Sequence, residues 1–275
     1  MKFQNAGVME RFVQFAAHIL HRSALTLNPE WFLRQDESLT RVASPATCAN
    51  IILGVTAATA IGIKSDSLQV FAVGLLWAVS VAALFYVATA GTRSCRRVVG
   101  ASKTVVAGRD MLDALAILVL LGAATVSAYA VYTAIQNSSL TPLLNCTTVV
   151  IALLLSLCLL LHPSLIGIEI SPLASAGEEA LSVALLLMKC LARQAGMLCG
   201  SLSVLGALAL GRATWTVLAS RSSSEMLIGR IELLAGVTLV LYGLLLPVIL
   251  YLAYICLALF ADLARAVLKQ LPENQ

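Results

Sequence analysis

Long apolar stretches alternate with short polar connectors along most of the chain. Crossing about 30 Å of hydrocarbon takes roughly twenty apolar residues, because an α-helix rises about 1.5 Å per residue. Six stretches approach or exceed that length, and none of them contains an Asp, Glu, Lys, Arg or His. They are Cys48–Ile63, Leu68–Gly91, Leu115–Ile135, Leu143–Leu161, Ala195–Leu210 and Leu233–Phe260. The pattern predicts an all-α integral membrane protein with about six transmembrane helices.

Three details of this pattern affect how the helices begin, bend and end. Ala195–Leu210 has only sixteen residues, so it either spans the membrane or re-enters it from one side. Pro247 lies inside the last stretch, where we expect a kink. The Ser44-Pro45 pair is expected to end a helix before the first span begins.

Two further segments have an amphipathic pattern, and we expect both to lie in the headgroup plane. The first is Met1–Arg22. The second, Glu178–Gln194, carries a polar stripe made of Glu178, Ser182, Lys189 and Arg193. An alternative makes the second segment the first half of a tilted span, Leu181–Leu210. That alternative is disfavoured, because a lysine or arginine near the bilayer centre costs about 2.5–3.5 kcal/mol.

Composition limits how the 275 residues can be divided. Sixty per cent of them are hydrophobic and 12% are charged, whereas a water-soluble domain has roughly a quarter of its residues charged. We therefore predict no separate soluble domain. The predicted division is an N-terminal interfacial segment at 1–46, a transmembrane bundle at 47–261 and a short tail at 262–275.

The basic residues predict the orientation. With six spans, only four of the 18 Lys and Arg fall on one side, and these are Lys64, Arg212, Arg221 and Arg230. The other fourteen fall on the opposite side, which the positive-inside rule assigns to the cytoplasm together with both termini. A re-entrant fifth segment would instead move the segment 211–231 to the inside and the C-terminus to the outside.

The sequence offers little catalytic chemistry. It has no GxSxG, HExxH, Walker A or GxGxxG motif, and its three histidines lie outside the spans. None of the seven cysteines is in CxxC spacing. We therefore predict no catalytic residue, no cofactor, no metal site and no nucleic-acid partner.

Small residues at four-residue spacing are a feature typical of helix packing in membranes, because they let two helix backbones approach closely. The predicted helix-packing residues are Gly54, Ala58, Gly62, Gly196 and Gly200. They either pack the chain's own helices or form a face for a partner.

A basic segment, Thr92–Arg109, follows the second span. Its cations are Arg93, Arg96, Arg97, Lys103 and Arg109. They are predicted to bind anionic lipid headgroups, at about 1 kcal/mol per residue near the surface, or a partner protein. The alternative is an anchor that only fixes orientation. Cys95 lies among these arginines, which predicts a reactive thiolate open to acylation.

The function predicted from these features is a non-catalytic scaffold or accessory subunit in the lipid bilayer, with a protein partner or a second copy of the chain. The alternative is a passive channel or facilitator for a small solute. Such a pore would be lined by the hydroxyl groups of Thr56, Thr59, Ser80, Thr89, Thr125 and Ser127.

Overall fold

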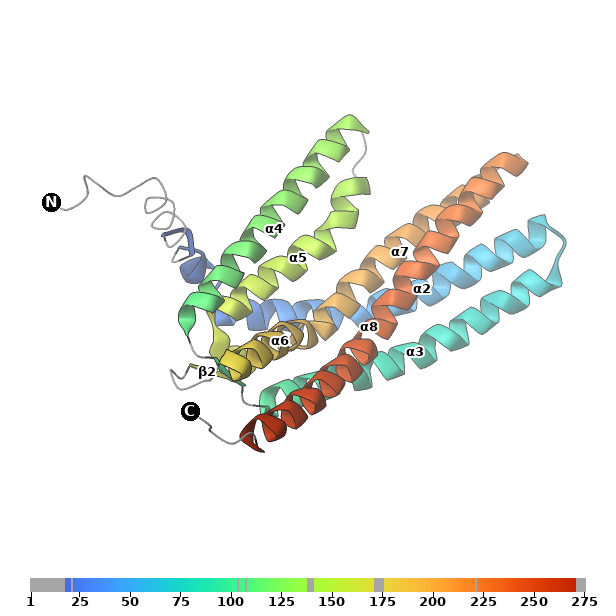
Figure 1. Ribbon diagram of the computed structural model, residues 1–275. Helices are drawn as coiled ribbons and strands as arrows, with labels where there is room; N and C mark the ends of the chain where they lie inside the picture. Colours follow the sequence, from blue (N-terminus) through green and yellow to red (C-terminus); the bar gives the residue numbers. More distant parts are fainter. Residues whose placement is uncertain are drawn as a thin grey trace. The chain divides into compact units, whose positions relative to one another are not determined.

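A computed structural model gives the fold and describes residues 18–20, 22–102, 104–106, 108–137, 141–170, 176–220 and 222–270. The helices are α2 (Pro29–Lys64), α3 (Leu68–Ala101), α4 (Arg109–Gln136), α5 (Thr141–Leu161), α6 (Ala176–Arg193), α7 (Ala195–Ala219) and α8 (Ser223–Gln270) (Figure 1). Between them lie strands β1 (Thr104–Val106) and β2 (Ile168–Ile170) and a 3-10 turn, η1 (Pro163–Ile166). Six helices, all of these but α6, are long and apolar enough to cross a membrane. The predicted all-α, multi-pass fold is confirmed.

The helix of the first span, α2, starts earlier than the sequence predicted. Asn28 caps α2, since its Oδ1 accepts a 2.7 Å hydrogen bond from the backbone N–H of Trp31, and Pro29 suits the first helical position. The predicted break at Pro45 is wrong, because α2 continues through it. Ala43, Ala46 and Thr47 around this proline are buried, so packing offsets the missing backbone hydrogen bond. The predicted division at 46/47 therefore falls inside a helix.

Other predicted connectors are also largely helical. The basic segment after the second span forms the last turns of α3 up to Ala101. Only residues 220–222 separate α7 from α8, so most of the predicted connector 211–231 is helix. With 25 residues, α7 is about 37 Å long, enough to cross the hydrocarbon. A re-entrant fifth segment does not fit an unbroken helix of this length.

The chain divides into two compact units. Among described residues, unit 1 takes those up to Arg34 and Gly100–Cys190, and unit 2 takes Gln35–Val99 and those from Leu191 onward. In unit 1, α4 packs against α5. The strands β1 and β2 pair in parallel, with Thr104 opposite Ile168.

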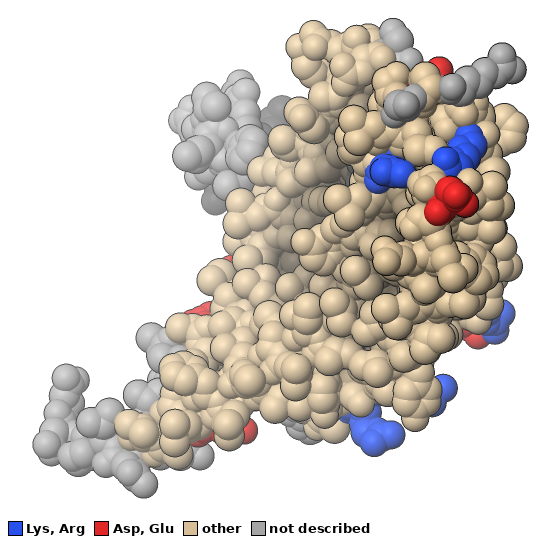
Figure 2. Space-filling model, turned by 90° about the vertical axis from the view of Figure 1, so that its right-hand side faces the viewer, with Lys and Arg blue, Asp and Glu red and all other residues tan. Residues whose placement is uncertain are grey.

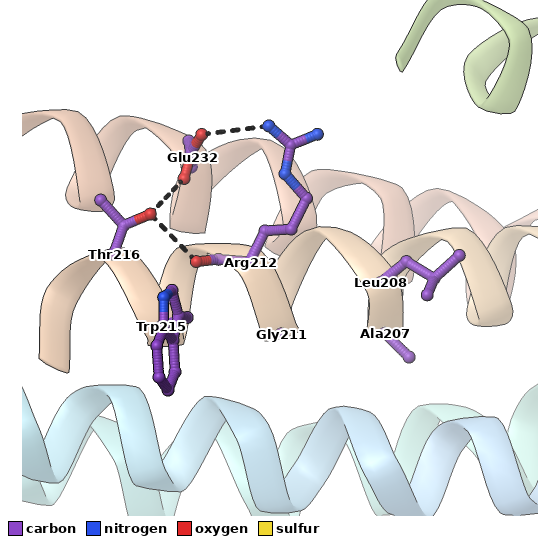
Figure 3. Close-up of a pocket in the computed structure, with 7 residues that line it drawn as sticks. All are labelled: Ala207, Leu208, Gly211, Arg212, Trp215, Thr216 and Glu232. Atoms are coloured by element: carbon purple, nitrogen blue, oxygen red, sulfur yellow. Dashed lines mark hydrogen bonds and ion pairs between the residues drawn. The ribbon is translucent and has the colours of Figure 1, made fainter. Parts of the chain in front are cut away.

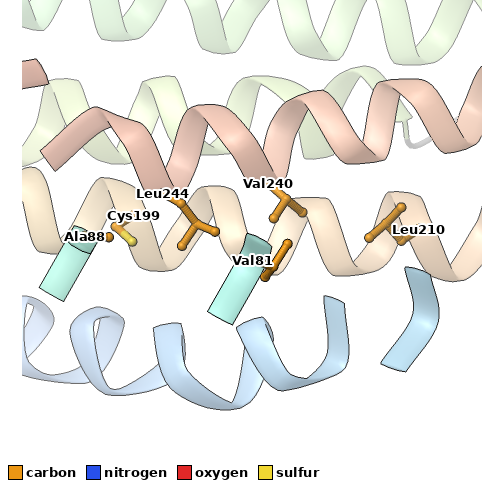
Figure 4. Packing of buried hydrophobic residues seen from close by; sticks show 6 residues of the cluster. All are labelled: Val81, Ala88, Cys199, Leu210, Val240 and Leu244. Atoms are coloured by element: carbon orange, nitrogen blue, oxygen red, sulfur yellow. The ribbon is translucent and has the colours of Figure 1, made fainter. Parts of the chain in front are cut away.

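Unit 2 is built from α2, α3, α7 and α8 around an apolar core. The fully buried centre of this core comes from three helices, with small and branched side chains in contact (Figure 4). These residues are Val81 and Ala88 of α3, Cys199 and Leu210 of α7, and Val240 and Leu244 of α8. Half-buried residues of α2, among them Ile51 and Leu53, pack against them.

Polar contacts at the two ends of unit 2 fix the helix directions. At one end, Lys64 at the end of α2 donates to the carbonyl oxygens of Val217 (2.6 Å) and Ser220 (2.8 Å), at the end of α7. At the other end, Asp36 near the start of unit 2 contacts Arg193, just before α7 begins. Hence α2 and α7 run parallel, and α3 and α8 return in the opposite direction. The turns α2–α3 and α7–α8 therefore lie at the same end, as a six-span topology requires.

Candidate functional site

A buried charged cluster lies at the end of unit 2 where α2 enters it. Asp36 has a side chain only 7% exposed, and two guanidinium groups hold it. Arg96 Nη2 lies 2.5 Å from Asp36 Oδ1, and Arg193 Nη1 lies 2.8 Å from Asp36 Oδ2. Arg96 also donates to Thr40 Oγ1 at 2.9 Å. Charge-assisted bonds of this kind tie α2, α3 and the last turn of α6 together.

The basic residues of the predicted binding face therefore have different environments. Arg93 and Arg97 are exposed and lie one helical turn apart on α3, so they share a face. Arg96, between them, is directed to Asp36 and is half-buried. Arg109 is exposed and 3.9 Å from Asp113, and Lys103 lies outside the described residues. Only Arg93, Arg97 and Arg109 of the predicted set are exposed in the described part of the chain.

The predicted reactivity of Cys95 is wrong. Its side chain is buried in unit 2, and its thiol donates to the carbonyl oxygen of Pro247 at 3.5 Å. A buried thiol next to apolar helices is neither ionised readily nor reached by an acyl donor. The nearby arginines do not change this, because they face away from it to Asp36 or to the surface.

The glycines with small-residue spacing lie at contacts between helices of unit 2. A Cβ on Gly200 would come within 2.0 Å of the carbonyl oxygen of Leu39 on α2. One on Gly54 would come within 2.1 Å of Trp77 Nε1 on α3, and one on Gly196 within 2.8 Å of Thr92 Cγ2. Gly62 approaches the turn at Ser67 O, at 3.2 Å, and Ala58 is buried. These close approaches are therefore used inside the chain.

The amphipathic helix α6 has its polar stripe on the opposite side from the one expected. Ser182 and Lys189 are fully buried, while Leu187 and Leu191 are exposed. Lys189 Nζ donates to the carbonyl oxygens of Ser102 (2.6 Å) and Ile166 (3.1 Å), next to β1 and β2. Burial lowers the pKa of Lys189 to about 8. The other predicted amphipathic helix, Met1–Arg22, lies almost wholly outside the described residues.

A groove on α7 and the start of α8 was missed by the sequence analysis. Its polar side is formed by Arg212, Thr216 and Glu232, and Figure 3 shows Arg212 reaching toward Glu232. Arg212 Nη2 lies 3.6 Å from Glu232 Oε1, and Thr216 Oγ1 donates to Glu232 Oε2 at 3.1 Å. Trp215 projects from the other side of α7 and is 73% exposed. Ala207, Leu208 and Gly211 complete the lining of an open groove of about 460 Å³.

The outer surface agrees with a lipid environment. Figure 2 shows one face on which the few charged side chains lie among a large majority of uncharged ones. Large apolar side chains are exposed on the spanning helices, including Leu76, Leu118 and Leu234. In the described part of the chain, no three His, Cys, Asp or Glu side chains come close enough to hold a metal ion.

Comparisons with protein-family models, curated proteins and solved structures give no match for this chain.

Proposed function

We propose that this protein is a non-catalytic membrane scaffold or accessory subunit that binds an acidic partner protein through Arg93 and Arg97. The observation that carries the proposal is the arrangement of the three arginines at the end of α3. Arg96 anchors this end of the helix to Asp36, while the two neighbours on either side remain exposed and share one face. An exposed cation pair on an anchored helix is suited to charge-dependent recognition.

The orientation proposed from the basic residues places this end of α3, and both termini, in the cytoplasm. The contact of Lys64 with Val217 at one end of unit 2 and that of Asp36 with Arg193 at the other support an alternating arrangement of the spans. Because Gly54, Gly196 and Gly200 already pack against the chain's own helices, the partner contacts other surfaces. Among the described residues, the apolar outer faces of the spans and the Arg93–Arg97 pair are exposed and available to a partner.

The test compares charge-neutralised variants in the host membrane. Tagged protein is extracted together with its surrounding lipid, and the amount of each co-extracted protein per chain is measured. Arg93→Gln and Arg97→Gln should each lower the amount of one stoichiometric partner, and added salt should have the same effect. Arg230→Gln at the opposite end of unit 2 is the matched control and should leave it unchanged. Partner amounts that are equal in all four proteins contradict the proposal.

The facilitator alternative receives less support from the hydroxyl groups expected to line a pore. Thr59 Oγ1 donates to Val55 O, and Ser127 Oγ donates to Ala123 O, both at 2.8 Å. Thr56, Thr89 and Thr125 likewise donate to carbonyl oxygens of their own helices. Their single donors are therefore satisfied without a permeating solute. A saturable solute flux through liposomes containing the purified chain, altered by Thr59→Val or Ser80→Ala, would favour the facilitator.

A further inference from the structure

We propose that the groove on α7 and the start of α8 binds one phospholipid with a zwitterionic headgroup. The groove combines a polar end with an apolar stretch, as an amphiphile does. Arg212 and Glu232 form the polar end, and Leu208 lies one helical turn away from Arg212, about 6 Å along α7 toward the centre of the helix. A headgroup at Arg212 would place the start of an acyl chain against Leu208 and Gly211.

The charges of the groove select the class of headgroup. Arg212 and Glu232 lie 3.6 Å apart and carry opposite charges, so the polar end has both signs and no net charge. A phosphate can bind the guanidinium of Arg212, while a headgroup ammonium can bind the carboxylate of Glu232. An anionic lipid without the ammonium would bring a second negative charge next to Glu232. The pair therefore favours a zwitterionic lipid over an anionic one.

Trp215 and Arg212 also lie at a depth in the membrane that suits contact with a lipid headgroup. Trp215 and Arg212 lie four and seven residues before Ala219, where α7 ends. The uncharged apolar stretch of α7 ends at Leu210, so Arg212 and Trp215 follow directly after it. Tryptophan is common at that level, where the headgroups meet the hydrocarbon.

The described part of the chain leaves the groove open. A Cβ on Gly211 would meet only Leu53 Cδ1, at an ordinary contact distance of 3.8 Å, whereas one on Gly200 would clash with backbone. The Cβ of a larger residue at 211 therefore fits without displacing backbone, and a leucine there would occupy part of the groove. Gly122 on α4 is an equally open position, with only Leu153 Cδ1 at 3.9 Å, and supplies the matched control.

Quenching of Trp215 fluorescence tests the proposal. The full chain is reconstituted into bilayers that contain an equal fraction of either brominated phosphatidylethanolamine or brominated phosphatidylglycerol. The Trp215 signal is the difference between the wild-type chain and Trp215→Phe. We expect the quenching to show that the zwitterionic lipid binds at least about threefold more tightly than the anionic lipid. Glu232→Gln and Gly211→Leu should each bring the ratio of the two lipid affinities close to one. Gly122→Leu should leave that ratio unchanged.

Three results would overturn the proposal. Equal quenching of the wild-type Trp215 by both lipids would mean that only bulk lipid meets the groove. Quenching by neither lipid would mean that protein covers it, either a partner or a second copy of the chain. Loss of preference in Gly122→Leu as well would show that it follows from general disturbance of the bundle.

Discussion

Replacing Asp36 with asparagine should destabilise the protein strongly while changing its shape very little. The amide keeps one oxygen that can accept a hydrogen bond, but the charge that holds Arg96 and Arg193 is lost. Removing one member of a buried ion pair costs about 3–5 kcal/mol, because the remaining charge is buried without compensation. The side chain of Arg96 is 38% exposed and can be partly hydrated, while that of Arg193 is only 15% exposed. We therefore expect a loss near the lower limit, about 3 kcal/mol.

The free energy of unfolding can be measured in mixed micelles by titration with a denaturing detergent. Asp113→Asn is the matched control, since Asp113 is exposed and 3.9 Å from Arg109, and its change should stay within about 0.5 kcal/mol. Arg193→Gln should cost more than Arg96→Gln, because Arg193 is the more buried partner. A change of less than about 0.5 kcal/mol in Asp36→Asn would refute the reasoning, since surface substitutions give values of that size.

Three other expectations follow from the helix contacts and from topology. Gly200→Ala should lower the free energy of unfolding by about 1–3 kcal/mol, because the added Cβ overpacks against backbone. Gly122→Ala should be neutral or stabilise by up to about 1 kcal/mol. Equal effects of the two substitutions would contradict the close α2–α7 approach. The lowered pKa of Lys189, about 8 against 10.5, means that the folded chain binds fewer protons than the unfolded chain between these values. The free energy of unfolding should therefore rise with pH across that window and be level below it, and Lys189→Met should remove this rise. Single cysteines at 102 and 223 should react with impermeant reagents from opposite sides of the membrane, and labelling from one side would contradict six spans.

The spans could be predicted from the sequence, because an uninterrupted apolar run has few alternatives to a membrane helix. Leu68–Gly91 and Leu115–Ile135 both lie inside helices that the structure assigns. The ends of the helices could not be predicted, because polar residues there join a helix when a distant partner satisfies them. Arg96 is such a residue, since its partner Asp36 is sixty positions earlier in the chain.

The same dependence on distant partners explains why the candidate sites were only partly found. The amphipathic pattern of α6 was correct, yet periodicity does not state which face is inward. The carbonyl oxygens of Ser102 and Ile166 are what direct Lys189 to the interior. The Arg212–Glu232 groove was missed because Arg212 was assigned to a connector and Glu232 to the edge of the last span. Continuing the helical pattern beyond Leu210 would have placed Arg212 and Trp215 about one turn apart on the same helix, α7.

The most direct test of the proposed function is the mass of the intact assembly released from the host membrane. The protein is extracted with its lipids, without detergent, and its particles are weighed by native mass spectrometry. A scaffold or accessory subunit should appear as a discrete assembly of this chain with a fixed number of partner chains. That assembly should dissociate as salt is raised, since Arg93 and Arg97 are proposed to hold it. A single chain accompanied only by lipid, at every salt concentration, would contradict the account.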